Sequence, residues 1–367
     1  MVDNYPELPP QVPEPKLDHS LSLYEPKIEI VDKSQVNKKY TPDGLVYYDQ
    51  QKNPVFPSRK KEYVRFSLPI EQVSPPRYVL IEGGMKKSGG MGTVCEFWDT
   101  KLEKRVMGKN ADYDTNSQYL KTIMEARKLA RLVHPNIVTI HDIGFEPDGN
   151  VYYIMDLIDG NNLDQLIEED SLSLSQISSI VHQMAQALSF IHQKGYIYSD
   201  FKPQNIIIRP DGITKLVDFG VMKKNIRGYI IPSGRTPFYT SPECIYTGKA
   251  TQATDIYAFA ATTLAMLLDS EDYHLFNLIK TDRPLPETIP FKRKFQEKLG
   301  HNSKISRELC RIFYKSLSYD PTQRHSSIEE FASEIEAVFQ ELGSPPSKSD
   351  YSLFPKQTTE RLDQGKG

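Results

Sequence analysis

The sequence predicts a two-part α+β protein, in which a small strand-rich region precedes a larger and mostly helical one. Between residues 78 and 157, short runs of β-branched and aromatic residues separated by turns predict strands, with one amphipathic helix among them over residues 117–133. After Gly160, apolar residues recur at helical spacing in three segments. These segments are residues 173–194, 309–317 and 326–342.

Composition and charge exclude several classes of protein. The chain has 367 residues, 38% of them apolar, which is enough for a substantial core. Its 45 basic and 48 acidic residues nearly balance, so nothing in the overall charge attracts nucleic acid, and we expect no nucleic-acid partner. The longest nearly uncharged apolar run, residues 256–268, is shorter than the roughly 20 residues of a membrane-spanning helix. The three cysteines lack metal-binding spacing, and the first residues lack a secretory signal, so we expect a cytoplasmic protein.

The chain is predicted to have three parts. Residues 1–76 contain 12 of the 26 prolines and predict a flexible N-terminal arm that serves as tether, inhibitor or partner-docking strand. Residues 77–342 form the folded domain, with a division between residues 157 and 158, and residues 343–367 form a polar tail. Nothing in the sequence determines the oligomeric state.

A glycine-rich segment lies between two predicted strands. Gly89, Gly90 and Gly92 let backbone N–H groups approach phosphate oxygens without interference from Cβ atoms. The segment leads into a strand rather than a helix, which disfavours a dinucleotide-binding fold. A hairpin turn that binds no ligand explains these glycines equally well.

A lysine and a glutamate follow this segment. Lys109 ends a predicted strand, and Glu125 lies within the amphipathic helix. A strand lysine that faces a helix glutamate can form an ion pair, which holds the ammonium where it can contact phosphate oxygens. Taken alone, both residues are also typical of ordinary surface charges.

Four polar residues cluster around a predicted hairpin, whose strands are residues 206–208 and 215–217. Asp218 and Asn205 carry the oxygen ligands that Mg²⁺ prefers. Asp200 can accept the proton of an attacking hydroxyl, and Lys202 can neutralise charge on a moving phosphoryl group. Polar turn residues at hairpin ends are the alternative, but they do not explain why all four occur together.

In this order, the motifs resemble the signature set of the eukaryotic-like serine/threonine protein kinase family, over residues 78–342. Ser241-Pro242-Glu243 resembles a further motif of the family, and Arg324 matches the arginine that pairs with its glutamate. Asp255 matches the aspartate of the buried helix that supports the catalytic loop. The stretch from Gly228 to Tyr257, together with the catalytic loop that begins with Tyr198, is most similar to the mycobacterial protein kinase G-like kinases.

The resemblance implies a bilobal protein-kinase fold, with a small antiparallel-sheet N-lobe that contains one helix and a larger, mostly helical C-lobe. It implies transfer of the γ-phosphoryl group of ATP, with Mg²⁺ or Mn²⁺, to Ser or Thr hydroxyls of protein substrates. The catalytic residues implied are Asp200, Lys202, Lys109 and Glu125, and the metal ligands are Asn205 and Asp218. The nucleotide-binding residues implied are Gly89, Gly90, Gly92, Val94, Lys109, Met155, Asp156, Ile158 and Ile207.

The sequence departs from the family pattern in three places. Lys87 replaces the first glycine of the loop, with Lys86 before it, and Met107 stands where a small alanine is usual. Ser199 replaces the arginine that pairs with a phosphate on the activation segment, which implies activity without phosphorylation of that segment. A nucleotide-binding pseudokinase scaffold is the alternative, and a small-molecule phosphotransferase ranks last.

Overall fold

A computed structural model describes residues 15–24, 27–41, 44–50, 54–57, 63–67, 76–89, 92–110, 117–146, 150–232, 238–268, 295, 299 and 302–346. Contacts within the chain divide it into two units. Unit 1 is Met1–Arg131 with Thr139–Leu157, and unit 2 is Leu132–Val138 with Ile158–Gly367.

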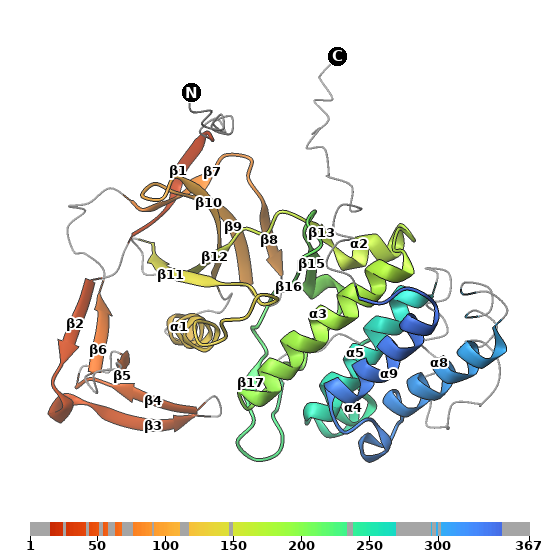
Figure 1. The fold of residues 1–367 in the computed structure, drawn as a ribbon. Coiled ribbons are helices and arrows are strands. Elements are labelled where there is room, and N and C mark those ends of the chain that lie inside the picture. The colour runs from red at the N-terminus through yellow and green to blue at the C-terminus, as the bar shows by residue number, and fades with distance from the viewer. Residues whose placement is uncertain are drawn as a thin grey trace, which may run out of the picture. The chain divides into compact units, whose positions relative to one another are not determined.

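Unit 1 contains a seven-stranded antiparallel sheet of order β1-β7-β9-β10-β12-β11, with β8 paired to β9 (Figure 1). The aromatic and β-branched residues of these segments favour a pleated, half-buried surface, which explains why they form strands. The bounds are β1 (Leu17–Leu23), β7 (Tyr78–Ile81), β8 (Lys86–Gly89), β9 (Gly92–Asp99), β10 (Lys104–Asn110), β11 (Ile140–Phe145) and β12 (Val151–Asp156). β8 and β11 are not evident from the sequence, because neither is a clear β-branched run.

The first strand closes this sheet on itself. The backbone of Tyr24, directly after β1, exchanges two hydrogen bonds with Phe145 of β11, at 2.8 and 3.0 Å. Because β1 and β11 are the two ends of the strand order, the bridge joins the edges of the sheet. Leu23 is completely buried here in a core on one side of the sheet. The other buried members of this core are Tyr78, Cys95, Phe97, Val106, Tyr152 and Ile154.

The expectation of a flexible arm over residues 1–76 is wrong for the described part of that segment. Besides β1, it forms a second sheet of five strands in the order β2-β6-β5-β4-β3. These strands are β2 (Lys27–Val31), β3 (Asn37–Thr41), β4 (Gly44–Tyr48), β5 (Pro54–Pro57) and β6 (Tyr63–Ser67), with a short 3-10 helix, η1 (Lys33–Gln35). The prolines of this segment are compatible with strands, because two of them lie at the ends of β5, where a strand tolerates a missing N–H.

One helix completes unit 1. α1 (Ser117–Leu129) packs against β12 and β11, and it ends four residues before the predicted boundary at residue 133. Its buried residues Ile123, Ala126 and Leu129 are spaced three residues apart, as expected for the apolar stripe of an amphipathic helix.

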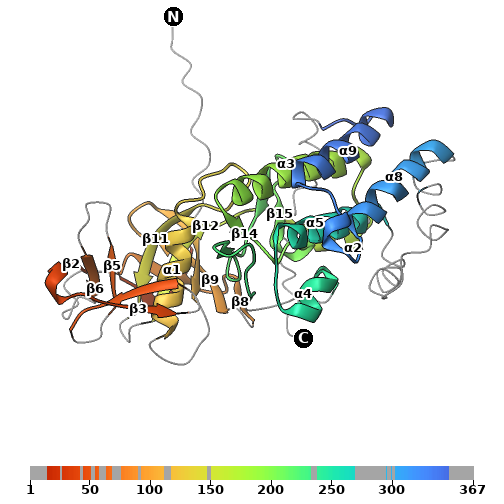
Figure 2. The same ribbon diagram turned by 90° about the horizontal axis from the view of Figure 1, so that it is seen from below.

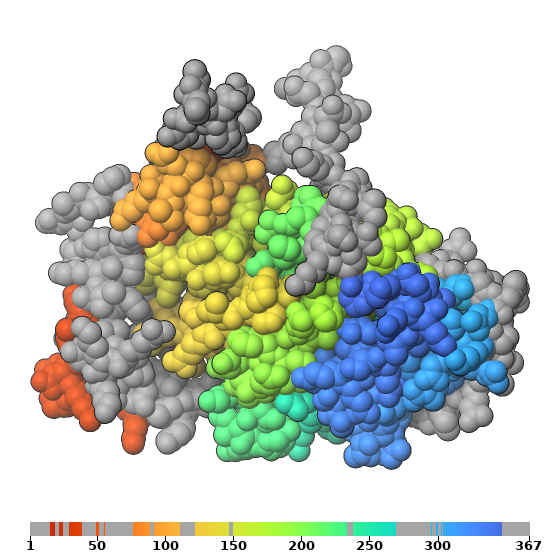
Figure 3. Space-filling model, in the orientation of Figure 1, coloured from red at the N-terminus to blue at the C-terminus, as the bar shows by residue number. Residues whose placement is uncertain are grey.

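Unit 2 is mostly helical, and its core lies among α3, α5 and α9, which contact one another (Figure 2). A capping box of Ser173 and Gln176 begins α3, and α5 is buried along almost its whole length. In Figure 3, α9 (blue) lies directly against α3 (yellow-green). The helices are α2 (Leu163–Glu168), α3 (Leu174–Gln193), α4 (Pro242–Thr247), α5 (Gln252–Leu267), α8 (Ser303–Ser316) and α9 (Ile328–Glu341).

Short strands and turns of unit 2 connect these helices. β13, β15 and β16 form one small sheet, and β14 pairs with β17. The strands are β13 (Asn161–Asn162), β14 (Tyr196–Ile197), β15 (Ile206–Ile208), β16 (Thr214–Leu216) and β17 (Lys223–Lys224), and the 3-10 helices are η2 (Pro203–Asn205) and η4 (Pro321–Gln323). β15 and β16 form the hairpin that the sequence predicts.

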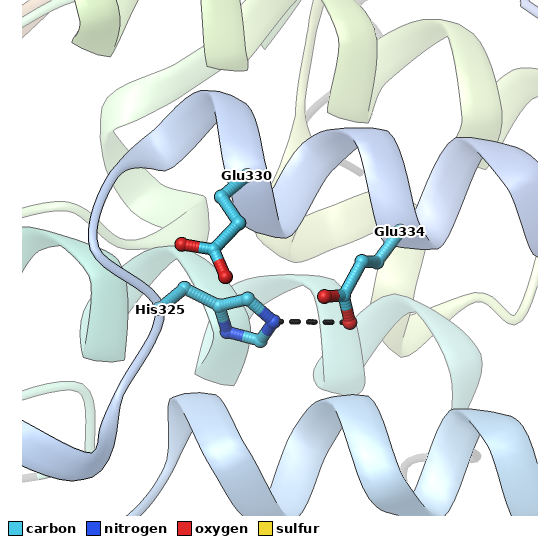
Figure 4. A group of neighbouring side chains, drawn as sticks. All are labelled: His325, Glu330 and Glu334. Atoms are coloured by element: carbon cyan, nitrogen blue, oxygen red, sulfur yellow. Dashed lines mark ion pairs between the residues drawn. The ribbon is translucent and has the colours of Figure 1, made fainter.

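A histidine and two glutamates lie together near the start of α9 (Figure 4). His325 is 2% exposed; its Nδ1 lies 2.6 Å from Ser316 Oγ and its Nε2 lies 3.2 Å from Glu334 Oε2. Glu330 and Glu334 both project toward this ring, and one atom from each of the three side chains lies within 4.8 Å of the others. Burial lowers the pKa of His325, which favours the neutral ring.

Although these three residue types can bind a metal ion, basic side chains of α8 already compensate both carboxylates. Lys315 Nζ lies 2.5 Å from Glu330, and an Arg311 nitrogen lies 2.7 Å from Glu334. A metal ion here would have to displace those cations. We therefore assign the group a structural role in joining α8 to α9.

Among the helices in the described parts of the chain, none has the length and apolar character needed to cross a membrane.

Candidate active site

The predicted lysine and glutamate of unit 1 lie side by side. Lys109, on β10, is 4% exposed, and its Nζ lies 3.7 Å from Oε1 of Glu125 on α1. The hydroxyl of Tyr153, on β12, donates a hydrogen bond of 2.7 Å to the same carboxylate oxygen. Glu125 is thus held by two side chains of the sheet, and the Lys109 ammonium is fixed at the surface of β10.

The register of the strands places the other predicted unit 1 residues around this lysine. Lys109 is the direct cross-strand partner of Val94 on β9, and Met107 is the partner of Met155 on β12. Direct partners and residues two apart share one face of a sheet. We call the face that carries Val94, Met107, Lys109 and Met155 the Lys109 face. Asp156 ends β12, and its carboxylate lies 2.5 Å from the ring of His141.

A glycine of β10 that the sequence analysis did not single out is required by packing. Gly108 lies on the face opposite Lys109, and a Cβ atom there would lie 2.6 Å from the ring of Phe97. Any larger residue would therefore push β10 away from the core beneath it. The signal in the sequence is a lone glycine within a strand pattern, which often marks a close approach.

The glycine segment forms the tip of the β8–β9 hairpin. Gly89 and Gly92 are its last described pair, and Gly92 has a φ of 121°, which L side chains rarely adopt. Ser88 and Thr93 make a side-chain hydrogen bond of 3.0 Å across the hairpin. Gly90 lies outside the described residues.

In unit 2, three of the predicted residues form one network. Lys202 Nζ lies 2.8 Å from Oδ2 of Asp200. The side-chain amide of Asn205 donates to the backbone oxygen of Asp200 at 2.9 Å and to Oδ2 at 3.1 Å. Asp200 and Asn205 are each 5% exposed, so these contacts lie in a desolvated environment where they are strong. The network gives the Asp200 carboxylate one orientation.

Asp218 is joined to this network through the backbone and through a buried tyrosine. The backbone N–H of Val217 donates a hydrogen bond of 2.9 Å to the backbone carbonyl oxygen of Asn205. The Tyr198 hydroxyl lies 2.7 Å from the carbonyl oxygens of both Val217 and Asp218. Burial, and then the charges of Asp218 and Asp200, raise the pKa of Tyr198 well above its ordinary value, so it remains a protonated donor.

The backbone before Asp200 is held by a carboxylate from the core. Asp255, on α5, is fully buried and accepts the N–H groups of Tyr198 at 2.9 Å and of Ser199 at 2.7 Å. The ring of His192 lies 2.7 Å from the same carboxylate, so this histidine helps to hold Asp255 in place. The predicted support of the loop by Asp255 is confirmed.

The predicted pair of Glu243 and Arg324 is also confirmed. Two guanidinium nitrogens of Arg324 donate to the two carboxylate oxygens of Glu243, at 2.9 and 2.7 Å. Burial opposes ionisation of Glu243, but the bonds and charge of Arg324 outweigh it and hold the pKa of Glu243 below its ordinary value. The same arginine lies over the ring of Tyr257 and donates to the oxygen of Ala253.

Two predicted nucleotide-binding residues lie in unit 2. Ile207, on β15, is paired with Asn162 and Lys215, and Ile158 follows directly after the boundary with unit 1. Both side chains are half-buried. The site residues thus form two groups, one around Lys109 in unit 1 and one around Asp200 in unit 2. Ser233 and Thr236 of the predicted activation segment lie outside the described residues.

Comparison with known proteins identifies the family of this chain. Residues 87–336 match the protein kinase domain. A probable serine/threonine-protein kinase of Clostridium acetobutylicum is 28% identical over 262 residues, which are 68% of this chain and 38% of the relative. Serine/threonine-protein kinase PknA of Mycobacterium tuberculosis is 27% identical over 301 residues, 75% of this chain and 66% of PknA. PknE of Mycobacterium bovis is 32% identical over 214 residues, 55% of this chain and 37% of PknE.

The matched regions therefore cover less than two thirds of each of these relatives. The chain belongs to the eukaryotic-like serine/threonine protein kinase family, as the motifs predict.

Proposed function

We propose that this chain is an active protein kinase that transfers the γ-phosphoryl group of Mg·ATP to Ser or Thr hydroxyls of protein substrates. The observation that supports this most strongly is the buried network of Asp200, Lys202 and Asn205, because every group with a direct chemical role is present and oriented. A scaffold that only bound nucleotide would not need this arrangement.

In this proposal the two groups of residues act on one bound nucleotide. Lys109, oriented by Glu125, contacts the phosphate chain, and the N–H groups of the β8–β9 hairpin support it. Asp200 accepts the proton of the attacking hydroxyl, and Lys202 neutralises charge on the phosphoryl group in transfer. Val94, Met155 and Ile207 would enclose the adenine, and the backbone from Asp156 to Ile158 would hydrogen-bond its edge.

The residues proposed for the metal have suitable chemistry. The nitrogen of the Asn205 side chain is engaged by Asp200, so its oxygen is the atom suited to a cation, and Asp218 supplies a carboxylate. Hard oxygen donors of this kind fit Mg²⁺, and also Mn²⁺. A bound ion would neutralise charge that develops on the phosphates.

We further propose that activity does not depend on phosphorylation of the activation segment. Ser199 offers no cation to a phosphate. Two described contacts can order this region instead. β14 pairs with β17, and the Tyr198 hydroxyl lies against the carbonyl of Asp218.

The proposed activity is tested by incubating the full chain with labelled ATP, Mg²⁺ and a generic protein acceptor. Asp200→Asn should lower transfer by about 10²- to 10⁴-fold because it removes the base. Asp211→Asn, in the exposed turn of the β15–β16 hairpin, is the matched control and should retain full activity. Nucleotide binding without transfer would indicate the pseudokinase scaffold, and transfer only to a metabolite would indicate the small-molecule phosphotransferase.

Independence from loop phosphorylation is tested separately. Phosphatase-treated chain, and a variant with alanine at Ser233 and Thr240, should each phosphorylate the acceptor at nearly the rate of untreated protein. Thr236 is left unchanged, because its hydroxyl is expected to bind the catalytic base, so that its loss would lower the rate for a reason other than phosphorylation. A fall of about tenfold or more on phosphatase treatment would refute the proposal.

A further inference from the structure

Two neighbouring lysines of β8, both exposed, differ in the face of the sheet on which they lie. Lys86 is the cross-strand partner of Cys95, whose side chain belongs to the core on the side away from Lys109. Burial raises the pKa of the Cys95 thiol and the Lys86 charge opposes that rise, which is consistent with Lys86 lying on the core side. Lys87 is the partner of Val94, so it lies on the Lys109 face.

Lys87, Val94 and Lys109 therefore form a row across three adjacent strands. Strands in a sheet lie about 4.8 Å apart, so the two lysine backbones are separated by roughly 10 Å, with both side chains on one face. Each lysine has a flexible four-carbon stem that lets its ammonium reach several ångströms from the backbone. An anion as long as a di- or triphosphate can contact both ammonium groups.

The acidic groups near this row are already engaged. Glu125 lies against Lys109 and Tyr153, while Glu96 pairs with Arg105 and accepts the N–H of Met85. Within the described parts of the chain, Lys87 itself makes no ion pair. It thus presents an uncompensated positive charge on the face proposed to bind nucleotide.

We propose that Lys87 is a nucleotide-binding residue that contacts the phosphate chain of ATP together with Lys109. This inference rests on the proposed function, since it takes the Lys109 face as the nucleotide site. A cation at the position where the family has a glycine would favour nucleotides with several phosphates over those with few or none. It would act mainly on binding, because the proton transfer at Asp200 involves other groups.

The experiment measures the Kd of Mg·ATP, Mg·ADP and adenosine by calorimetry on the full chain. Lys87→Gln, which removes the charge but keeps a polar side chain only one atom shorter, should weaken ATP binding about three- to tenfold. Its effect on adenosine should stay below about twofold, and the loss for ATP should shrink at high salt because the contact is exposed. Lys86→Gln, one residue away on the other face, should bind ATP like the wild type, and Lys87→Arg should retain the affinity.

Three results would overturn the assignment of Lys87. These are an unchanged Kd for ATP in Lys87→Gln, an equal loss in Lys86→Gln, or an equal loss for adenosine. A wild-type chain that binds no ATP would overturn the proposed function and this inference together. A chain that binds ATP but transfers nothing would refute only the activity, and the comparison of Lys87 with Lys86 would still decide the inference.

Discussion

Two residues of the catalytic segment adopt left-handed backbone conformations that only glycine adopts freely. Ser199 has a φ of 64° and Asp218 a φ of 60°. Each such residue costs on the order of 1–3 kcal/mol and persists only where its surroundings impose it. Asp255 holds the N–H of Ser199, and Tyr198 holds the carbonyl of Asp218. Tyr198 and Asp255, both buried, therefore maintain the backbone shape on either side of the Asp200 network.

The first prediction concerns the Tyr198 hydroxyl. Tyr198→Phe should lower the free energy of unfolding by about 1–2 kcal/mol, because the carbonyls of Val217 and Asp218 lose the hydroxyl that they share as a hydrogen-bond donor. It should also reduce phosphoryl transfer, since Asp218 is no longer fixed. Chemical denaturation and the kinase assay measure the two effects. Tyr319→Phe, at an exposed ring, is the control and should change neither quantity. A Tyr198→Phe variant with wild-type stability and rate would contradict this role.

The second prediction concerns the dependence of stability on pH at Glu243. Its pKa in the folded chain lies below the ordinary value of 4.5, so the ion pair with Arg324 stabilises the fold above that value. The contribution is lost as the pH falls through the lower, folded-state pKa. The difference in unfolding free energy between wild type and Glu243→Gln should therefore narrow between about pH 6 and about pH 3. A difference that stayed constant over this range would exclude the effect.

At the scale of elements, Arg324 joins three segments of unit 2. Its guanidinium group donates hydrogen bonds to the carboxylate of Glu243 on α4, to the backbone oxygen of Ala253 on α5, and to the backbone oxygen of Ser318, which follows α8. α4 has six residues and is too short to be stable alone, so it depends on such contacts. The pair therefore fixes the helix that follows the activation segment.

The third prediction tests that link. Arg324→Met should destabilise unit 2 by about 3–5 kcal/mol, because it leaves the largely buried Glu243 without its cation. The double variant Arg324→Met with Glu243→Gln removes the unpaired charge and should recover part of the loss. The stability of the single and of the double variant is measured by thermal or urea unfolding, which is monitored through the helical circular dichroism signal. Equal destabilisation of the single and double variants would argue against an uncompensated charge as the cause.

The fourth prediction concerns β1. Leu23→Ala should destabilise unit 1 by about 2–5 kcal/mol, since it opens a cavity in the core beneath β7 and β9. Unfolding is followed by the fluorescence of Trp98, the single tryptophan, which lies on β9. Lys16→Ala, at an exposed position directly before β1, should leave the unfolding midpoint unchanged. A wild-type midpoint for Leu23→Ala would show that β1 does not stabilise the unit.

Much of this arrangement could be predicted from the sequence, and the exceptions have physical causes. The hairpin of Ile206–Ile208 and Thr214–Leu216 and the helix from Leu174 to Gln193 were predicted, because their periodicity and turn residues agree. β1 was missed, because it is stabilised by distant partners, β7 and Phe145, which no local pattern reveals. The residue types alone predict that Lys109 pairs with Glu125. The hydrogen bond from Tyr153 to Glu125 could not be predicted, because it depends on the register that places Tyr153 opposite Lys109.

At the scale of the whole molecule, each unit has a core of its own. Unit 1 is built around the buried residues of its closed sheet, and unit 2 around α3, α5 and α9. Units with separate cores commonly unfold in separate steps. Every described α-helix except α1 belongs to unit 2, so circular dichroism reports chiefly on that unit, while Trp98 reports on unit 1.

The fifth prediction uses these two probes. Leu23→Ala should lower the unfolding midpoint measured by Trp98 fluorescence more than the midpoint measured by circular dichroism. Arg324→Met should do the reverse and lower the circular dichroism midpoint more. Equal shifts of both signals by each substitution would instead mean that the two units unfold as one cooperative block.

The position of β1 in the closed sheet has a further consequence. The whole five-stranded sheet lies in the chain between β1 and β7, two strands that pair directly with each other. A single proteolytic cut between Tyr24 and Arg77 would therefore break the polypeptide without separating the pieces. The short amino-terminal fragment should migrate with the remainder on gel filtration and part from it only in denaturant, in the manner of a protein reconstituted from complementary fragments.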